Sequence, residues 1–349
     1  SPSRPRPSRR AVLAAAAAAV SAAGLAGLSG GAGAETASGG GVPVGGLGER
    51  FLRDSGGAHE AIFDTAIRGY LPAGPATFLH KARAHPEALD RLLVLGETHT
   101  HPIHHRIHMD AIRGFVALRE DSPSRPVAIG MEHFYRQHQN YLDLFSSGRV
   151  SLATLRRLTK WDAVSSVPFR LVAPLLAQAR ASGVRVVGLN CPGEVASLVA
   201  RVGLEGVPEE LRELLPDVEL GDVKHWERFR RVMLSMMGEH GGQMDEQSLR
   251  RYYEATTLWD EYMAESAAMY LKETESQGGR LLVFAGTHHV DERNGMPDRI
   301  MKRSGVRAFT VVPVALPWKD GLPDVDRVPT SQTADWVWYT PREDEMMTI

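Results

Sequence analysis

The sequence has little of several features that define large classes of proteins. Its 349 residues include a single cysteine, Cys191, which excludes an intrachain disulfide framework and a cluster of cysteine thiolates around a metal. The formal net charge is only -2 at pH 7, so the chain has no excess of basic residues for binding nucleic acid. Long apolar runs are absent after about residue 40, so we expect no membrane span in the mature protein.

The first 34 residues have the pattern of an export signal. Arginines at positions 4, 6, 9 and 10 form a basic head, residues 11–28 form an uncharged, alanine-rich run, and residues 32–34 (Ala-Gly-Ala) offer a cleavage site. The adjacent Arg9 and Arg10 resemble a twin-arginine signal. The alternative interpretation is an alanine-rich membrane anchor.

The beginning of the chain also bears on its location and domain limits. Because it starts with Ser1 rather than Met, we expect a longer precursor. A chloroplast transit peptide ahead of this signal would direct the protein to the thylakoid lumen, which is the location that we predict; the bacterial periplasm is the alternative. Residues 35–50 are rich in glycine and predict a linker, so the folded domain is expected at residues 51–349.

Short apolar runs predict the strands of a parallel sheet. Each run is continuous rather than alternating, which is typical of strands covered on both faces. Helical patterns at residues 103–118 and 169–181 lie between them, and such alternation of strand and helix predicts an α/β fold with an open parallel sheet flanked by helices. The predicted strands are residues 92–95, 127–131, 184–189, 281–285 and 308–313.

A long helical segment, from about residue 192 to 276, is predicted between the third and fourth of these strands. It holds six of the 12 methionines and many aromatic residues. We interpret it as a helical cap over the carboxyl edge of the sheet, with His225 on its outer surface. Two explanations of its Met and aromatic content stay open: a ligand pocket, and ordinary packing of helix on helix.

Two turns of the same pattern follow the first and the fourth predicted strand: Gly96-x-x-His99 and Gly286-x-x-His289. Glycine permits a sharp turn at a strand end, and histidine can bind metal, bind haem or transfer a proton. Parallel strands end at one edge of a sheet, where ligands bind. We therefore expect His99 and His289 to lie in one site.

Acidic residues accompany these turns. Glu97 follows the first strand and Glu132, next to His133, follows the second. Either carboxylate could ligate a metal, orient a histidine or act as a general base. The alternative for both is an ion pair with Arg91 or Arg299 at the rim of the sheet.

Five of the 14 histidines fall within residues 99–108. A helix that begins at Pro102 would place His104 and His108 on its apolar stripe, so we expect both to be buried. For His108, ligation and a structural hydrogen bond to the backbone both stay open. His101 precedes this helix and is interpreted as a capping residue.

Taken in order, these residues resemble the ChaN-like haem-binding family of the wider Tiki/TraB/erythromycin-esterase superfamily. That superfamily shares the paired Gly-x-x-His turns and acidic residues that match here as Glu97 and Glu132. The ChaN-like pattern continues over most of the globular part of the chain. Its further matching segments are residues 104–105, 161–162, 188–192, 202–216, 258–265, 295–300 and 335–338.

The resemblance implies a protein that binds haem or a related tetrapyrrole outside the cytosol and is linked to haem or iron handling. Members bind haem at a dimer interface, so a homodimer is compatible with it. Arg106, Arg293 or Arg299 could pair with the haem propionates. The residues that we assign to the cofactor site are His99, His105, His288, His289, Glu97, Glu132 and Arg299.

A metal-dependent hydrolase is the alternative function. Two branches of the superfamily have hydrolytic chemistry, and the extra histidines His133 and His288 suit a metal ion as well as haem. A divalent metal would then be bound by His99, His289, Glu97 and Glu132, or these residues would activate a water molecule. Whether the protein is an enzyme therefore stays open from the sequence, and no catalytic residue is assigned.

Overall fold

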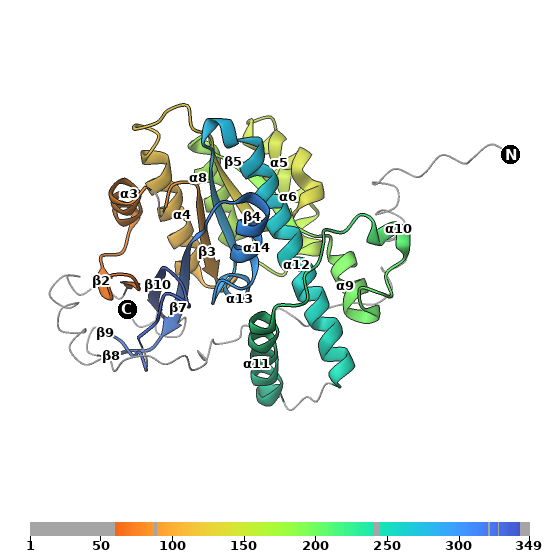
Figure 1. Ribbon diagram of the computed structural model, residues 1–349. Coiled ribbons are helices and arrows are strands. Elements are labelled where there is room, and N and C mark those ends of the chain that lie inside the picture. The colour runs from red at the N-terminus through yellow and green to blue at the C-terminus, as the bar shows by residue number, and fades with distance from the viewer. Residues whose placement is uncertain (1–59, 87–88, 241–244, 320–321, 327, 343–349) are drawn as a thin grey trace.

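The computed structural model describes residues 60–86, 89–240, 245–319, 322–326 and 328–342 (Figure 1). The expected signal at residues 1–34, the linker at residues 35–50 and the predicted start of the domain at residue 51 lie outside the described residues.

An eight-stranded, mostly parallel sheet forms the centre of the fold, in the order β2–β1–β10–β7–β3–β6–β4–β5. Every pair from β10 to β5 is parallel, whereas β1 is antiparallel to both β10 and β2. The strands are β1 (Ala61–Asp64), β2 (Gly69–Leu71), β3 (Leu92–Glu97), β4 (Val127–Tyr135), β5 (Arg185–Asn190), β6 (Arg280–Gly286), β7 (Phe309–Leu316) and β10 (Trp336–Pro341). A separate hairpin pairs β8 (Trp318–Lys319) with β9 (Leu322–Pro323).

The five strands predicted from apolar runs are confirmed as β3 to β7. Sequence patterning missed the antiparallel hairpin of β1 and β2, whose four and three residues are too short to show a period. It also missed β10, which follows β7 and joins the hairpin to the parallel strands. The fold class is confirmed, with a mixed edge in place of a purely parallel sheet.

Helices cover both faces of the sheet, which explains why its strands are apolar throughout. Along β3, Leu93 and Leu95 belong to one hydrophobic cluster, while Leu92 and Val94 belong to another on the opposite face. The first face packs against α3 (Pro75–Ala84), α4 (Pro102–Ala117), α5 (Gln139–Ser146), α6 (Leu152–Leu158), α7 (Trp161–Val164) and α8 (Phe169–Ala181). The second face packs against α12 (Glu246–Glu273) and α14 (Met296–Ser304).

Local signals in the sequence set the ends of the two predicted helices. Pro102 is the first residue of α4, where its missing N–H costs no hydrogen bond. α8 spans Phe169–Ala181 as predicted, and Gly183, with φ of +61°, lies just beyond its end. His104 and His108 are fully buried on α4, as their place on its apolar stripe predicted.

The segment between β5 and β6 is helical. It holds α9 (Gly193–Val202), α10 (Glu209–Arg212), α11 (Val223–His240) and α12, and Figure 1 shows α11 and the amino-terminal half of α12 projecting away from the sheet. The aromatic rings of Trp226, Phe229 and Tyr253 pack on one another with centroids 4.9 to 6.1 Å apart. These rings therefore pack α11 against α12.

The expected position of His225 on the outer surface of this segment is wrong. Its side chain is 1% exposed, because α11 turns that residue toward Asp260 of α12.

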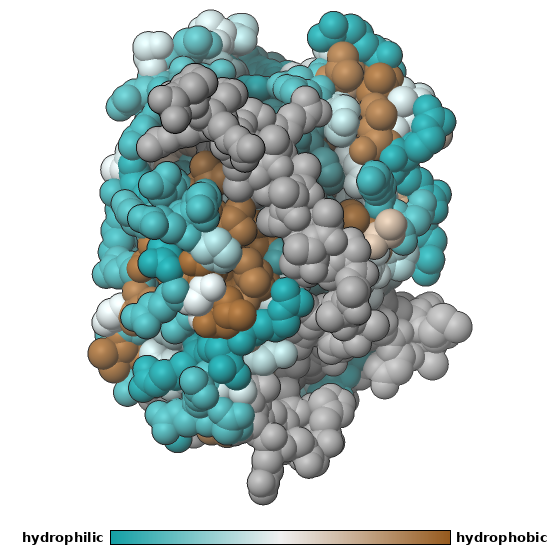
Figure 2. Space-filling model, turned by 90° about the vertical axis from the view of Figure 1, so that its right-hand side faces the viewer, coloured by the Kyte–Doolittle hydropathy of each residue, from teal (hydrophilic) through white to brown (hydrophobic). Residues whose placement is uncertain are grey.

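None of the helices among the described residues has the length and apolar character needed to cross a bilayer. On the face shown in Figure 2, hydrophilic residues predominate among those coloured, and apolar residues gather in separate clusters.

Candidate functional site

The strand order brings the predicted site residues to neighbouring positions. β6 lies between β3 and β4, and Glu97 at the end of β3 pairs in register with Gly286 at the end of β6. α13 (Thr287–Val290) begins immediately after β6 and carries His288 and His289. Groups from three adjacent strand ends therefore share one edge of the sheet.

Histidines surround the buried carboxylate of Glu97. Its Oε1 lies 2.6 Å from Nδ1 of His99 and 2.9 Å from Nε2 of His133. Its Oε2 lies 3.2 Å from Nδ1 of His108 and 3.9 Å from Nδ1 of His105. Burial alone would raise the pKa of Glu97, but the histidines, His133 foremost, hold it well below its usual value. The group is therefore a carboxylate.

Glu132, on β4, lies between the two Gly-x-x-His turns. Its Oε1 is 3.8 Å from Nε2 of His99 and 3.6 Å from Nε2 of His289. Its Oε2 accepts a hydrogen bond of 2.6 Å from the backbone N–H of Gly286. The two turns thus meet at one carboxylate, as their shared position after parallel strands predicted. Burial would raise the pKa of Glu132, but His289 and His99 outweigh burial, so the pKa lies below its ordinary value.

Asp260 completes the inner side of the site and was missed from the sequence. It is fully buried on α12, where its Oδ1 lies 2.7 Å from Nδ1 of His289 and its Oδ2 lies 3.1 Å from Nε2 of His225. Burial would raise the pKa of Asp260, but the two histidines hold it below its ordinary value. Burial would lower the pKa of His289, but Glu132 and Asp260 raise it. The adjacent acidic residues Asp260 and Glu261, set among apolar residues of a helical segment, were the available signal.

Backbone carbonyls set the ring orientation of two histidines on α4. Nε2 of His105 lies 2.8 Å from the carbonyl oxygen of His99, and Nε2 of His108 lies 3.2 Å from that of Gly96. A carbonyl oxygen can only accept, so each Nε2 donates and each neutral ring has a bare Nδ1 facing Glu97. Burial lowers the pKa of His105, and lowers that of His108 to about 4, so both are neutral at pH 7.

His104, on α4, and His101, just before it, make structural hydrogen bonds. Nδ1 of His104 accepts a 2.8 Å hydrogen bond from the N–H of Thr98, and its Nε2 lies 3.2 Å from Oγ1 of Thr340. His101 occupies the N-cap position without a side-chain capping bond, and its Nε2 lies 3.0 Å from the carbonyl oxygen of Pro341. His101 therefore ties α4 to β10 and does not cap the helix.

His99 is partly exposed and His288 is exposed, in contrast to the buried His289 beside them. The side chain of His99 is 30% exposed, and His288 is an exposed residue. They flank Gly286, where an added Cβ would lie 3.0 Å from Cε1 of His288 and 3.2 Å from Nε2 of His99. Burial lowers the pKa of His99, but Glu132 and Glu97 raise it to about 9.

The three arginines considered for propionate binding all have partners within the chain. Arg299 is buried, and its guanidinium also donates to the carbonyl oxygens of Asn294 and Gly295. The carboxylate partners of Arg299, Arg106 and Arg293 are Glu261, Asp110 and Asp335, respectively. Neither rim pair proposed for Glu97 and Glu132 forms, because Arg91 donates to backbone carbonyl oxygens.

A surface hollow of about 360 Å³ lies next to the site rather than in it. Its lining includes Trp161, Phe169 and Arg156. The ring of Trp161 is stacked near that of His133, with centroids 6.2 Å apart, so this hollow and the cluster around Glu97 share a wall.

The chain matches the model of a known protein family. The family model described as "Haem-binding uptake, Tiki superfamily, ChaN" matches residues 87–300, more than half of the chain. A search of curated proteins finds no match.

Solved structures are also similar to this chain. ChaN of Campylobacter jejuni, solved as a study of cofacial haem binding, has a TM-score of 0.59 and 15% identity over 80% of this chain and 96% of that one. The type III effector HopBA1 has a TM-score of 0.43 and 10% identity, covering 78% of this chain and 95% of that one. An erythromycin esterase, EreC, has a TM-score of 0.41 and 12% identity, covering 76% and 94%. By its family match, this chain belongs to the ChaN family of haem-binding uptake proteins in the Tiki superfamily.

Proposed function

We propose that this chain binds haem at the carboxyl edge of its sheet, with the imidazole of the exposed residue His288 as an iron ligand and His99 beside it. One observation carries the proposal: the imidazoles of His99 and His288 both lie over Gly286, whose missing side chain lets the two rings come close together at the end of the strand. The family to which the chain belongs supports the same ligand.

The surroundings of His288 suit a flat, apolar ligand with a metal centre. Its ring lies against that of His289, with centroids 3.8 Å apart, and its carbonyl oxygen accepts a hydrogen bond from Arg228 of α11. Val232, one turn along α11 from Arg228, is 40% exposed and offers apolar surface nearby. Bound haem would bring an iron ion that takes an imidazole as axial ligand.

A second copy of the chain would complete such a site. His288 lies on the exposed surface, so one copy would cover only one face of a haem placed there. Haem binding to ChaN of Campylobacter jejuni is cofacial, which supports a paired arrangement here. We therefore include in the proposal a homodimer formed around the ligand.

The proposal places the protein in an exported compartment, where it handles haem or the iron derived from it. Its support is the arginine pair, alanine-rich run and Ala-Gly-Ala segment within residues 1–34. Amino-terminal sequencing of the native protein is the test. A mature end after Ala34 is expected, and a membrane-bound form that retains Arg9 would contradict export.

Titration of haemin into the full chain tests the binding itself. Wild type should give a saturable Soret shift with one haem per chain, and His288→Ala should weaken binding by at least about tenfold through loss of an iron ligand. The control is His80→Ala, which removes another exposed histidine, on α3. A flat titration of protein whose circular dichroism shows the folded state would overturn the proposal, as would equal losses in the two variants.

A metal-dependent hydrolase is a second candidate, favoured by a different observation. Carboxylates of Glu97 and Asp260 hold Nδ1 of His99 and His289, respectively, so both Nε2 atoms point toward Oε1 of Glu132. Histidines oriented in this way are the usual ligands of catalytic zinc. The test is hydrolysis of ester or peptide substrates. Activity that wild type loses on chelation and regains with added metal, and that His289→Ala lacks, would establish this function. No activity in metal-loaded wild type would eliminate it.

A further inference from the structure

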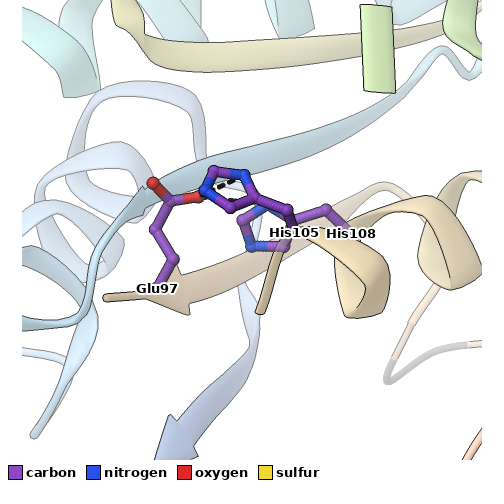
Figure 3. A group of neighbouring side chains, drawn as sticks. All are labelled: Glu97, His105 and His108. Carbon is purple, nitrogen blue, oxygen red and sulfur yellow. Dashed lines mark ion pairs between the residues drawn. The ribbon is translucent and has the colours of Figure 1, made fainter. Parts of the chain in front are cut away.

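We propose that Oε2 of Glu97 and the Nδ1 atoms of His105 and His108 form a buried site for one divalent cation of the zinc type. This site is separate from the exposed edge at His288, and it does not depend on haem binding. Figure 3 shows the three side chains converging from the end of β3 and the first turns of α4.

The secondary structure aims the three ligand atoms at one point. His105 and His108 are three residues apart on α4, so their rings project from the same side of the helix. Glu97 ends the strand that precedes this helix and directs its carboxylate toward both rings. The ligand atoms all lie within 4.8 Å of one another, and all three residues are buried.

The hydrogen positions leave the centre of this group without a proton. The Nε2–H groups of His105 and His108 donate hydrogen bonds to the carbonyl oxygens of His99 and Gly96, respectively. Both Nδ1 atoms therefore carry no hydrogen and can only accept. Among the described residues, neither Oε2 of Glu97 nor Nδ1 of His108 has a hydrogen-bond partner. Three acceptors facing one another in a buried space are unfavourable, and a cation converts them into ligands.

The spacing between Glu97 and His108 matches that around a tetrahedral ion, and the spacing between Glu97 and His105 is somewhat longer. Bonds of about 2.0–2.1 Å to nitrogen and oxygen place the ligand atoms of a tetrahedron roughly 3.3 Å apart. Oε2 of Glu97 lies 3.2 Å from Nδ1 of His108 and 3.9 Å from Nδ1 of His105. The imidazole N–H groups donate to backbone carbonyls, which is the support that metal-bound histidines commonly have.

A neighbouring group around the other oxygen of Glu97 is not the metal site. His99 and His133 approach Oε1, but Nδ1 of His99 is only 2.6 Å from this oxygen, the length of a charge-assisted hydrogen bond. A proton therefore occupies that contact. The hydrogen bond with His99 and the contact of Nε2 of His133, 2.9 Å from Oε1, hold the carboxylate in place while Oε2 faces the two bare nitrogens.

The experiment uses the full chain, stripped with a chelator and titrated with Zn²⁺ or with Co²⁺, whose visible absorption reports tetrahedral coordination. Wild type should bind one tightly held equivalent at this site. His105→Gln and His108→Gln should each weaken its binding by more than the roughly 10–100-fold that loss of a supporting partner costs. The matched control is His104→Gln, a buried histidine of the same helix whose Nδ1 already accepts a hydrogen bond.

Other variants separate this ion from haem and from an ion at the two glycine turns. Glu132→Gln and His288→Ala should each retain the tightly held equivalent, even where haem binding falls. If His108→Gln does not fold, His105→Gln carries the same expectation. Failure of folded wild type to bind Zn²⁺ or Co²⁺ would overturn the proposal, and so would equal loss of the ion in His104→Gln.

Discussion

His99 and His289, which come from turns far apart in the sequence, lie on either side of a single carboxylate oxygen. Their Nε2 atoms are 3.8 Å and 3.6 Å from Oε1 of Glu132. Each Nδ1 is held by a different buried carboxylate, Glu97 for His99 and Asp260 for His289. The two turns therefore form one electrostatic unit.

Substitutions of these two histidines should not be additive. His99→Ala and His289→Ala each remove an imidazole that contacts Glu132, so their effects on haem affinity and on the free energy of unfolding should be coupled by about 0.5–3 kcal/mol. Double-mutant cycles in both measurements test this. Cycles that pair His99→Ala with His80→Ala should give additive effects, and additivity for His99 with His289 would mean that the turns act separately.

His99 should titrate well above an ordinary histidine. Burial lowers its pKa, but Glu132 and Glu97 raise it to about 9. NMR titration of its ring protons should show this midpoint, and Glu132→Gln should move it toward about 6.5. Because the folded pKa is raised, the stability from His99 is complete below about pH 6.5 and is lost as pH rises through about 9. A midpoint that Glu132→Gln leaves in place would contradict the assigned cause.

The thiol of Cys191 should be inert in the folded protein. It is fully buried after β5, and burial raises its pKa to about 12. A thiol reagent at pH 8 should therefore label no cysteine in native protein and one per chain in denaturant. Rapid labelling of native protein would show that this strand end opens to solvent.

Asp64 should stabilise the antiparallel edge in a pH-dependent way. Its carboxylate lies 3.0 Å from Nζ of Lys81 and accepts a 2.9 Å hydrogen bond from Nε1 of Trp336. Burial raises its pKa, but these partners lower it further, so the stability is present above about pH 3.9 and is lost as pH falls through the folded pKa. Asp64→Asn should cost about 1.5–3 kcal/mol at pH 7 and less in acid.

A surface pair provides the comparison for Asp64. Asp121 pairs with Arg83, but both side chains are about half exposed, at 50% and 47%. Asp121→Asn should therefore leave the free energy of unfolding nearly unchanged, because solvent screens this pair. The measurement is denaturant unfolding of both variants at several pH values. If Asp64→Asn and Asp121→Asn lose equal free energy of unfolding, burial does not explain the stabilising effect of Asp64.

Gly96 should tolerate no side chain. A Cβ there would lie 2.8 Å from Oγ1 of Thr287, 3.2 Å from its Cα and 3.3 Å from Cδ of Pro313. The backbone of Thr287 and the ring of Pro313 cannot move aside easily. Gly96→Ala should therefore lower the free energy of unfolding by about 1–3 kcal/mol, measured by denaturant unfolding. Gly69→Ala, whose Cβ would approach no atom nearer than 3.8 Å, should change stability by about 0.5 kcal/mol or less. Unchanged stability in Gly96→Ala would refute the close packing of the first turn.

Local pattern in the sequence determined the parallel core and the two glycine turns. Continuous apolar runs mark β3 to β7 because both faces of those strands are covered, and Pro102 marks the start of α4 because it suits a first helical turn. Buried His104 and His108 followed from the spacing of apolar residues on that helix.

Only the tertiary structure decided which side chains meet. The order β3–β6–β4 places Glu132 between His99 and His289, and α12 brings Asp260 to His289. The same packing turned His225 inward, where the sequence had suggested an outer position. Periodicity reports whether a residue faces the core, since that depends on near neighbours; the partner that it finds there depends on strand order and helix crossings, which no local pattern encodes.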